Sequence, residues 1–332
     1  MASFRMLTRK YSFTILAAFA LLWIGSYGFA QDAPPMPKGF ESEEALKAAL
    51  LMGQIKIIDA AHVTVPDTVE EIKDIEYGKV GDRSLQLDLY VPKNLTKPVP
   101  VIVFIHGGAW KSGKRSDMKF YTVDYAAKGY VTATISYRFT QEAIFPAAVQ
   151  DAKCAIRWLR ANAKKYHIDP DKIGVSGNSA GGHLSMMIGY SSDAPELEGN
   201  GGNPGVSSRV QAVVDFYGPV DMTTPFARKQ GVLISFLGGK TYEEAPELYV
   251  KSSPMTYLTP DDPPTAIFHG TIDSVVPIDQ ADSLAKKLQE LKIPYVYDRF
   301  EGWIHTMDLA EAVNVRCRYQ MDKFFAKYLP VK

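Results

Sequence analysis

The first two strand-like segments of the chain differ in the spacing of their hydrophobic positions. Residues 84–91 alternate apolar with polar side chains, which is typical of a strand with one buried face. Gly81 and Asp82 come just before this segment and favour a hairpin turn that pairs it with residues 72–79. Residues 99–105 are instead apolar throughout, as expected for a strand that helices cover on both faces. The chain therefore predicts an antiparallel hairpin that leads into a buried parallel sheet.

Strand-like and helix-like segments alternate through the rest of the chain. Further strands are predicted at residues 131–137, 210–216, 265–269 and 295–300, and helices at residues 42–52, 116–128, 147–166, 278–291 and 306–328. Ser42 and Ser116 are the expected N-caps of the first two helices. A hairpin followed by this alternation is typical of an α/β fold with a mostly parallel sheet and helices on both faces. Residues 221–264 interrupt the alternation and predict a small cap insertion over the carboxyl ends of the strands, where such folds bind ligands.

A basic and then apolar N-terminus precedes these elements. The apolar run covers residues 13–24, and small residues follow it. This order is typical of a signal peptide over residues 1–30, which predicts an exported protein with no stable membrane association after cleavage. The length of the run leaves an uncleaved membrane anchor as the alternative. Residues 31–69 would then form an N-terminal extension of the main domain, residues 70–332.

Composition narrows the classes of function. The 332 residues are 46% apolar, which suffices for the core of one large α/β domain. The 37 basic residues balance 37 acidic ones, which argues against nucleic acid as a partner because binding phosphates takes a basic excess. The six histidines are scattered and only two cysteines occur, so no metal site is expected.

The segment around Ser179 carries the clearest chemical signal. A β-branched run ends in Gly177-Asn178-Ser179-Ala180-Gly181, and a helical pattern begins at once. A serine at such a strand-to-helix turn is held in a strained conformation that lifts its hydroxyl clear of the sheet, and the glycines let strand and helix pass closely. The N-terminus of the helix favours negative charge there. Ser179 is therefore predicted as a nucleophile.

A serine nucleophile needs a base and a third group that orients the base. His305 follows the last predicted strand, and Asp273 follows the strand before it. Because the carboxyl ends of parallel strands share one edge of a sheet, the order Ser179, Asp273, His305 brings the three side chains together. Asp221, which also follows a strand, is the alternative acid.

Two adjacent glycines follow the first buried strand and predict an oxyanion hole. The backbone N–H groups of Gly107 and Gly108, with that of Ala180, are the expected donors, and each donor typically contributes about 3 kcal/mol to stabilising a tetrahedral oxyanion. Aromatic residues lie beside the same loops and are predicted to line a substrate pocket: Trp110, Tyr217 and Trp303.

These motifs resemble those of the α/β-hydrolase superfamily over about residues 70–330. The His-Gly-Gly-Ala-Trp loop at residues 106–110 and the Gly-Asn-Ser-Ala-Gly-Gly elbow are similar to those of esterases near hormone-sensitive lipase, and most similar to bacterial BD-FAE-like esterases. The resemblance implies an eight-stranded sheet and a catalytic set of Ser179, Asp273 and His305. Feruloyl and acetyl esterases occur in the BD-FAE-like group, which implies plant-polysaccharide esters as a substrate class. Gly-Gly-Ala in place of Gly-Gly-Gly sets the chain apart from the lipase branch.

The expected function is that of an exported serine carboxylesterase without a cofactor, acting on small-molecule or polysaccharide-linked esters. Two alternatives stay open. A peptidase of the prolyl-oligopeptidase type shares the elbow but normally carries a propeller-like domain, for which the residues before the first strand are too few. A non-catalytic binding module on the same fold usually lacks one of the three catalytic residues, whereas all three occur here.

Overall fold

The computed structural model describes residues 33–60 and 62–331. By its contacts the chain divides into Met1–Pro34 and Pro35–Lys332, and every element named below belongs to the second unit. The predicted signal peptide over residues 1–30 lies outside the described residues. In the described part of the chain, no helix has both the length and the apolar character that crossing a bilayer takes.

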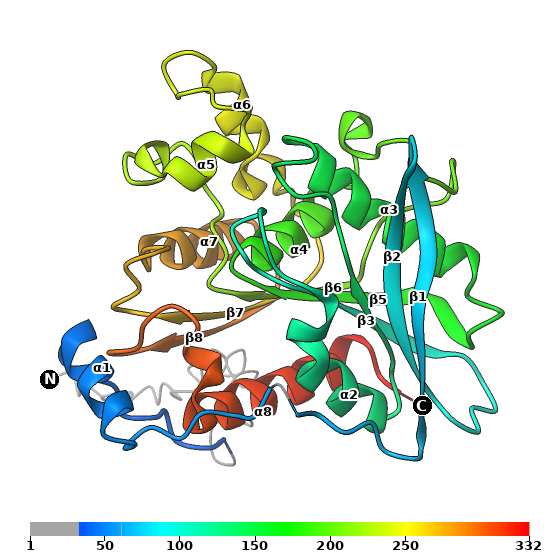
Figure 1. Ribbon diagram of the computed structural model, residues 1–332, viewed down its shortest axis with the longest axis horizontal. Coiled ribbons are helices and arrows are strands. Elements are labelled where there is room, and N and C mark those ends of the chain that lie inside the picture. The colour runs from blue at the N-terminus through cyan, green and yellow to red at the C-terminus, as the bar shows by residue number, and fades with distance from the viewer. Residues whose placement is uncertain (1–32, 61, 332) are drawn as a thin grey trace, which may run out of the picture. The chain divides into compact units, whose positions relative to one another are not determined.

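One eight-stranded sheet forms the centre of this unit (Figure 1). Its strands are β1 (Val69–Val80), β2 (Arg83–Pro92), β3 (Val99–Ile105), β4 (Val131–Ile135), β5 (Ile168–Asn178), β6 (Ala212–Phe216), β7 (Thr265–Gly270) and β8 (Tyr295–Phe300). Their order across the sheet is β1-β2-β4-β3-β5-β6-β7-β8. β2 runs antiparallel to both of its neighbours, and all pairs from β4 to β8 are parallel. The predicted hairpin and the mostly parallel sheet are confirmed.

Helices cover both faces of the sheet. They are α1 (Glu43–Leu51), α2 (Lys119–Ala127), α3 (Ala147–Ala161), α4 (Ala180–Tyr190), α5 (Gly231–Phe236), α6 (Pro246–Lys251), α7 (Asp279–Glu290) and α8 (Glu311–Tyr328). α3, α4 and α7 pack on the face that carries Val103 and Val175, whereas α1, α2 and α8 pack on the face that carries Phe104 and Phe268. Figure 1 shows these two helical layers above and below the strands. The core is therefore split into two apolar layers by the sheet.

Helix boundaries show where local sequence signals are sufficient. Ser42 accepts a hydrogen bond from Ala45 N–H at 3.2 Å and caps α1, as predicted. Ser116 caps no helix, because it lies inside a 3-10 turn that precedes α2. α3 ends at Ala161, before the predicted boundary. α8 begins only at Glu311 because Thr306 has a left-handed φ of 62°, residues 307–309 form a 3-10 turn and Ala310 is extended.

The segment between β6 and β7 is the part that interrupts the regular alternation. It contains α5, α6 and two 3-10 turns, and Figure 1 shows α5 and α6 standing outside the layer formed by α4 and α7. The interrupting segment therefore adds a separate lobe to one side of the sheet.

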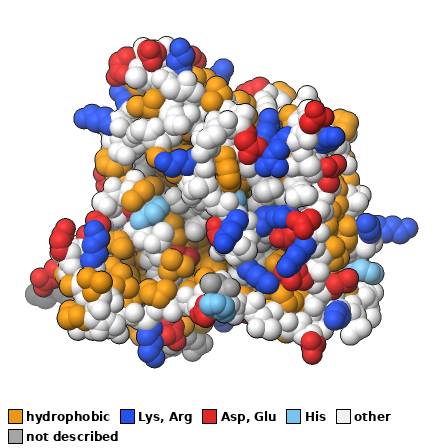
Figure 2. Space-filling view, in the orientation of Figure 1, with side chains coloured by type: hydrophobic (Ala, Val, Ile, Leu, Met, Phe, Trp, Pro, Cys, Tyr) orange, Lys and Arg blue, Asp and Glu red, His pale blue; other side chains and the backbone are white. Residues whose placement is uncertain are grey.

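Charged side chains of both signs are interspersed on the face shown in Figure 2, where no single basic patch dominates.

Candidate active site

Ser179 lies at the turn between β5 and α4. Its backbone has φ 54° and ψ −119°, a strained left-handed conformation for a residue with a side chain. The turn needs close packing, since a Cβ on Gly181 would lie 2.0 Å from the carbonyl oxygen of Ile105. The Ser179 N–H donates to Phe216 O at 2.8 Å, which fixes the turn to β6. The predicted strand, sharp turn and helix are all present.

Three side chains form a continuous hydrogen-bonded chain at the carboxyl edge of the sheet. The Ser179 Oγ lies 3.0 Å from His305 Nε2, and His305 Nδ1 lies 2.6 Å from Asp273 Oδ2. These residues follow β5, β8 and β7, so the parallel strands bring them together. Asp221, the alternative acid, instead accepts hydrogen bonds from the N–H and hydroxyl of Thr223 within its own turn. The geometry therefore favours Asp273.

Asp273 is held as a carboxylate. Burial by itself would raise its pKa, but hydrogen bonds from His269 and His305 outweigh that effect and lower the pKa to about 2. Its other oxygen, Oδ1, accepts the N–H groups of Val275 and Val276, each at 2.8 Å. A fixed negative charge beside Nδ1 keeps the proton of His305 there and leaves Nε2 free to accept the Ser179 proton.

The loop after β3, residues 106–110, is called the oxyanion loop below. One of the N–H groups predicted to act as donors in this loop does not fit that role. The N–H of Gly107 donates to Asn178 Oδ1 at 2.7 Å, so it is already engaged and does not fit the role predicted for it. Among the described residues, the N–H groups of Gly108, Ala109 and Ala180 make no hydrogen bond. Ala109 and Ala180 also line a cavity together with Ser179. Ala109 is therefore a better candidate donor than Gly107.

An inner cavity of about 280 Å³ opens at Ser179. Its lining is mostly apolar and comes from the oxyanion loop, the segment between β6 and β7, and the loop after Asp273: Ala109, Trp110, Ser179, Ala180, Pro219, Met222, Phe226, Ala227, Gln230, Val232, Leu233, Ser274, Val275, Val276, Pro277 and Gln280. Of the three aromatic residues predicted to contact substrate, Trp110 lies in this lining. Its ring stacks on Phe236 at 4.4 Å, and its Nε1 donates to His183 Nδ1 at 3.1 Å.

Tyr217 and Trp303 occupy other positions. The Tyr217 ring lies 4.5 Å from the His305 ring but is fully buried, and its hydroxyl donates to Asp308, so Tyr217 supports the histidine from behind. Trp303 lines a second cavity of about 280 Å³ that also borders His305. Neither residue lines the inner cavity, because the loops after β6 and β8 turn these rings into the core below the site.

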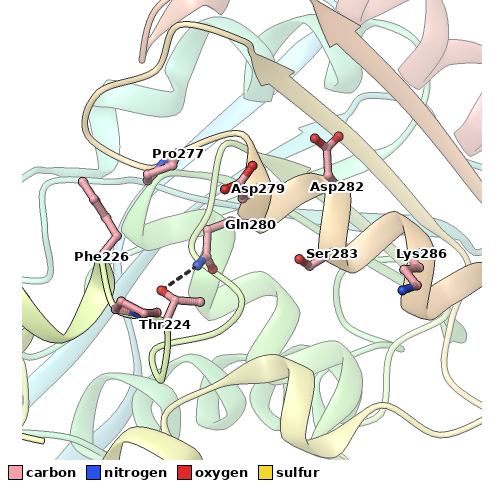
Figure 3. A pocket seen from close by; sticks show the side chains of 9 residues that line it. Thr224, Phe226, Pro277, Asp279, Gln280, Asp282, Ser283 and Lys286 are labelled. Atoms are coloured by element: carbon pink, nitrogen blue, oxygen red, sulfur yellow. Dashed lines mark hydrogen bonds between the residues drawn. The ribbon is translucent and has the colours of Figure 1, made fainter.

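An outer cavity of about 630 Å³ adjoins the inner one. Phe226, Pro277 and Gln280 line both cavities, and the outer one adds polar groups that include Asp279 and Ser283. Figure 3 shows Gln280 reaching from α7 towards Thr224, and its Nε2 donates to Thr224 Oγ1 at 3.3 Å. The same side chain accepts the N–H groups of residues 220 and 221, so Gln280 fixes the start of the segment between β6 and β7 to α7.

Asp215 is a buried residue on β6, and its carboxyl group lies next to α4, the helix that follows Ser179. Its Oδ1 accepts the Gly218 N–H at 2.9 Å, and its Oδ2 has no partner within the described chain. Burial, opposed by a weaker effect of His269 and by that hydrogen bond, raises the pKa of Asp215 to about 7. The neutral acid is therefore the form that the fold accommodates, and sequence patterns gave no sign of it.

This raised pKa predicts a pH-dependent stability. The pKa of Asp215 in the folded protein lies above the unfolded value of about 3.9. The stability that the neutral Asp215 carboxyl contributes is therefore fully present below that unfolded pKa. It is lost as the pH rises through about 7, by about 4 kcal/mol at most. The free energy of unfolding in urea is expected to fall between pH 5 and pH 8 by less for Asp215→Asn than for the wild type. Asp193→Asn, at an exposed site, is the control, and equal losses in wild type and Asp215→Asn would contradict the assignment.

Ser179, whose hydroxyl is bonded to His305, lines the inner cavity together with Ala109 and Ala180, whose N–H groups make no hydrogen bond within the described part of the chain. Within residues 33–60 and 62–331, no group of three or more histidine, cysteine, aspartate or glutamate side chains could hold a metal ion. A three-layer α/β unit with Ser179 at a strained elbow, Asp273 after β7 and His305 after β8 defines the class of α/β hydrolases.

Comparison with known proteins places the chain within this class. The BD-FAE family model matches residues 87–288, more than half of the chain, and the chain belongs to this family. "Esterase LipC" of Mycobacterium tuberculosis is 34% identical over 242 residues, which cover 70% of this chain and 60% of LipC. The chain thus spans about 60% of that relative's length.

Solved structures show the same fold. A "truncated form of carbohydrate esterase from gut microbiota" has a TM-score of 0.64 at 27% identity, covering 80% of this chain and 98% of that one. Thermogutta terrifontis Est2 with propionate bound has a TM-score of 0.68 at 28% identity, covering 80% of this chain and 97% of Est2. The eight-stranded α/β-hydrolase fold is thereby confirmed by its structural neighbours.

Proposed function

We propose that this protein is a serine carboxylesterase that works through an acyl-enzyme on Ser179. The observation that carries the proposal is the continuous chain from Ser179 Oγ through His305 to Asp273, at 3.0 and 2.6 Å. The names of the relatives, which include esterases and a carbohydrate esterase, support ester hydrolysis.

The geometry supports a two-step reaction. His305 Nε2 takes the proton of Ser179 as the hydroxyl oxygen attacks the ester carbonyl, and the N–H groups of Gly108, Ala109 and Ala180 stabilise the oxyanion. His305 then gives the proton to the leaving alcohol, and the acyl group remains on Ser179. Water, deprotonated by the same nitrogen, releases the acid and restores Ser179. Each step moves one proton through His305 and needs no redox partner.

We further propose acetyl or feruloyl esters of plant polysaccharides as substrates. The apolar inner cavity of about 280 Å³ has room for an acetyl or an aromatic acyl group. The outer cavity supplies hydroxyl, amide, carboxylate and ammonium groups, which suit a saccharide, beside the ring of Phe226. The carbohydrate esterase among the structural neighbours favours the same substrate class.

A panel of esters combined with active-site labelling tests this function. The purified protein is expected to hydrolyse p-nitrophenyl acetate, p-nitrophenyl butyrate, methyl ferulate or acetylated xylan, and to take up one fluorophosphonate group that peptide mass mapping places on Ser179. Label on another residue would remove Ser179 as the nucleophile. Cleavage of a prolyl peptide anilide without any ester hydrolysis would favour the peptidase alternative, and neither activity nor label would favour a binding module.

We also propose export, with cleavage after residue 30. The support is the basic and then apolar order of residues 1–30 and the small residues at their end. Expression of the full chain in a bacterial host is expected to yield a periplasmic or secreted protein that begins at Gln31. A product that keeps residues 1–30 and sediments with membranes would instead support the uncleaved anchor.

A further inference from the structure

An N-terminal segment lies against the loop that carries His305. We call residues 37–58, which include α1, the clasp, and residues 301–310 the histidine loop. Both segments lie outside residues 87–288, the part of the chain that the family model matches. Figure 1 shows α1 beside the end of the sheet that carries β8, far in sequence from the loop it accompanies.

The first half of the clasp is bonded to the start of the histidine loop. The Phe40 N–H donates to Gly302 O at 2.9 Å, and Trp303 Nε1 donates to Pro37 O at 3.3 Å. The rings of Phe40 and Trp303 meet edge to face, with centroids 5.7 Å apart. A Cβ on Gly39 would lie 1.9 Å from Glu301 O, so the two backbones are in direct contact. The start of the loop is therefore fixed two residues before His305.

The second half of the clasp is bonded to the end of the same loop. The Ile58 N–H donates to Leu309 O at 2.9 Å, and Ile57 forms an antiparallel bridge with Ala310. The Glu311 N–H donates to Lys56 O at 2.8 Å, which continues this pairing into α8. Between the two bonded ends, Thr306 keeps its left-handed φ of 62°, a conformation that persists only where surrounding contacts hold it.

The clasp also reaches the loop that carries the acid. Ser274 follows Asp273 directly and lines the inner cavity, and its hydroxyl donates to Glu43 Oε2 at 3.0 Å. Leu46 is buried in the same core layer as Trp303 and Met307, so α1 packs under the histidine loop while Glu43 holds the acid loop. One short segment thus contacts the loops of two catalytic residues.

We propose that the clasp supports the active site. Phe40 and Glu43 act as positioning residues that hold His305 and Asp273 in the correct position relative to Ser179. This inference rests on the proposed esterase function. Neither residue touches the reacting atoms, so each acts through a loop. A displacement of about 1 Å at a catalytic group can lower the rate about a hundredfold. Loss of such a support should therefore be measurable as a lower reaction rate.

Point variants of the full chain test the proposal. Phe40→Ala is expected to lower kcat for p-nitrophenyl acetate about tenfold or more with KM changed less than about twofold, because the base is displaced while the inner cavity stays intact. Phe40→Tyr keeps the ring and is expected to restore kcat. Glu43→Ala is expected to lower kcat about threefold, and Glu43→Gln, whose amide oxygen can still accept the Ser274 hydroxyl, to recover most of it.

The matched control is Glu44→Ala, which removes the neighbouring acidic side chain of the same helical turn and is expected to leave kcat unchanged. The rate of Ser179 phosphonylation at saturating fluorophosphonate should fall in parallel with kcat, whereas a purely structural role would lower only the melting temperature. If Phe40→Ala does not fold, the Glu43 pair decides. Unchanged kcat and phosphonylation in both alanine variants would overturn the positioning role, and a wild type without esterase activity would instead remove the function on which it rests.

Discussion

Ser179→Ala is expected to lower kcat for esters about a million-fold, and Asp273→Asn about ten thousand-fold. Under the proposed mechanism no acyl-enzyme can form without the Ser179 hydroxyl, so only the candidate oxyanion donors and the cavity would remain. Asparagine at position 273 keeps the shape of the acid but donates to Nδ1 or leaves it unpaired, so His305 no longer presents a basic Nε2 to Ser179. The smaller effect at Asp273 follows because His305 and Ser179 stay in place.

Stopped assays with p-nitrophenyl acetate at high enzyme concentration measure both losses. Ser185→Ala is the matched control, since it removes a buried hydroxyl on the same helix α4 that has no hydrogen-bond partner among the residues the structure describes, and it is expected to keep activity. Melting temperatures of the two serine variants should lie close to that of the wild type, whereas Asp273→Asn is expected to melt somewhat lower because the buried carboxylate stabilises the fold through its hydrogen bonds. Activity above about one percent in Ser179→Ala would show that another residue supplies the nucleophile.

Gly181→Ala is expected to destabilise the protein by about 3 kcal/mol or more, or to prevent folding. The added methyl group would lie 2.0 Å from Ile105 O and 2.7 Å from His106 O, both backbone atoms at the end of β3. Because both are backbone atoms, they cannot swing aside as the end of a flexible side chain could, so the backbone itself would have to shift. A typical domain is stable by about 5–15 kcal/mol, so the expected loss is a large share of the total.

Urea unfolding of soluble Gly181→Ala, or the yield of folded protein, measures this effect. Gly231→Ala is the matched control, because a methyl group at this position of α5 would meet no described atom within 4 Å apart from its chain neighbours and its own helix backbone, and the backbone has no left-handed φ. Alanine is a better helix former than glycine, so this variant is expected to keep or slightly raise stability. Equal stability of the two variants would mean that β3 and the elbow are less tightly packed than described.

The sequence predicts this fold well where each signal is local. The apolar run in residues 99–105 identifies a strand that is buried on both faces, as predicted. Residues 84–91 also form a strand, but their alternation of buried and more exposed side chains holds only as far as Leu87, because Asp88 and Tyr90 are buried as well. Ser179, Asp273 and His305 follow from one rule, that parallel strands end at the same edge. The structure brings them within hydrogen-bonding distance of one another.

The parts that sequence reasoning missed depend on backbone conformation or on contacts between distant segments. Gly108, Ala109 and Trp110 all have positive φ, and this succession, with Asn178 holding Gly107, decides which N–H groups stay free. A glycine pair alone cannot specify that choice. The pairing of residues 37–58 with residues 301–310 joins segments about 260 positions apart, as the Trp303–Pro37 bond shows, and no local pattern encodes it.

The lobe between β6 and β7 bears on how a family of such enzymes can diversify. Met222, Phe226 and Leu233 come from one uninterrupted stretch, whereas the reacting groups come from the ends of β5, β7 and β8. In-frame insertion, deletion or recombination within that stretch would alter which acyl groups the cavity accepts. The reacting groups would keep their positions at the ends of the strands. Under the proposed function, part of the cavity lining is thus encoded separately from the reacting groups, and exchange of this stretch between relatives is expected to change selectivity while the three reacting residues stay in place.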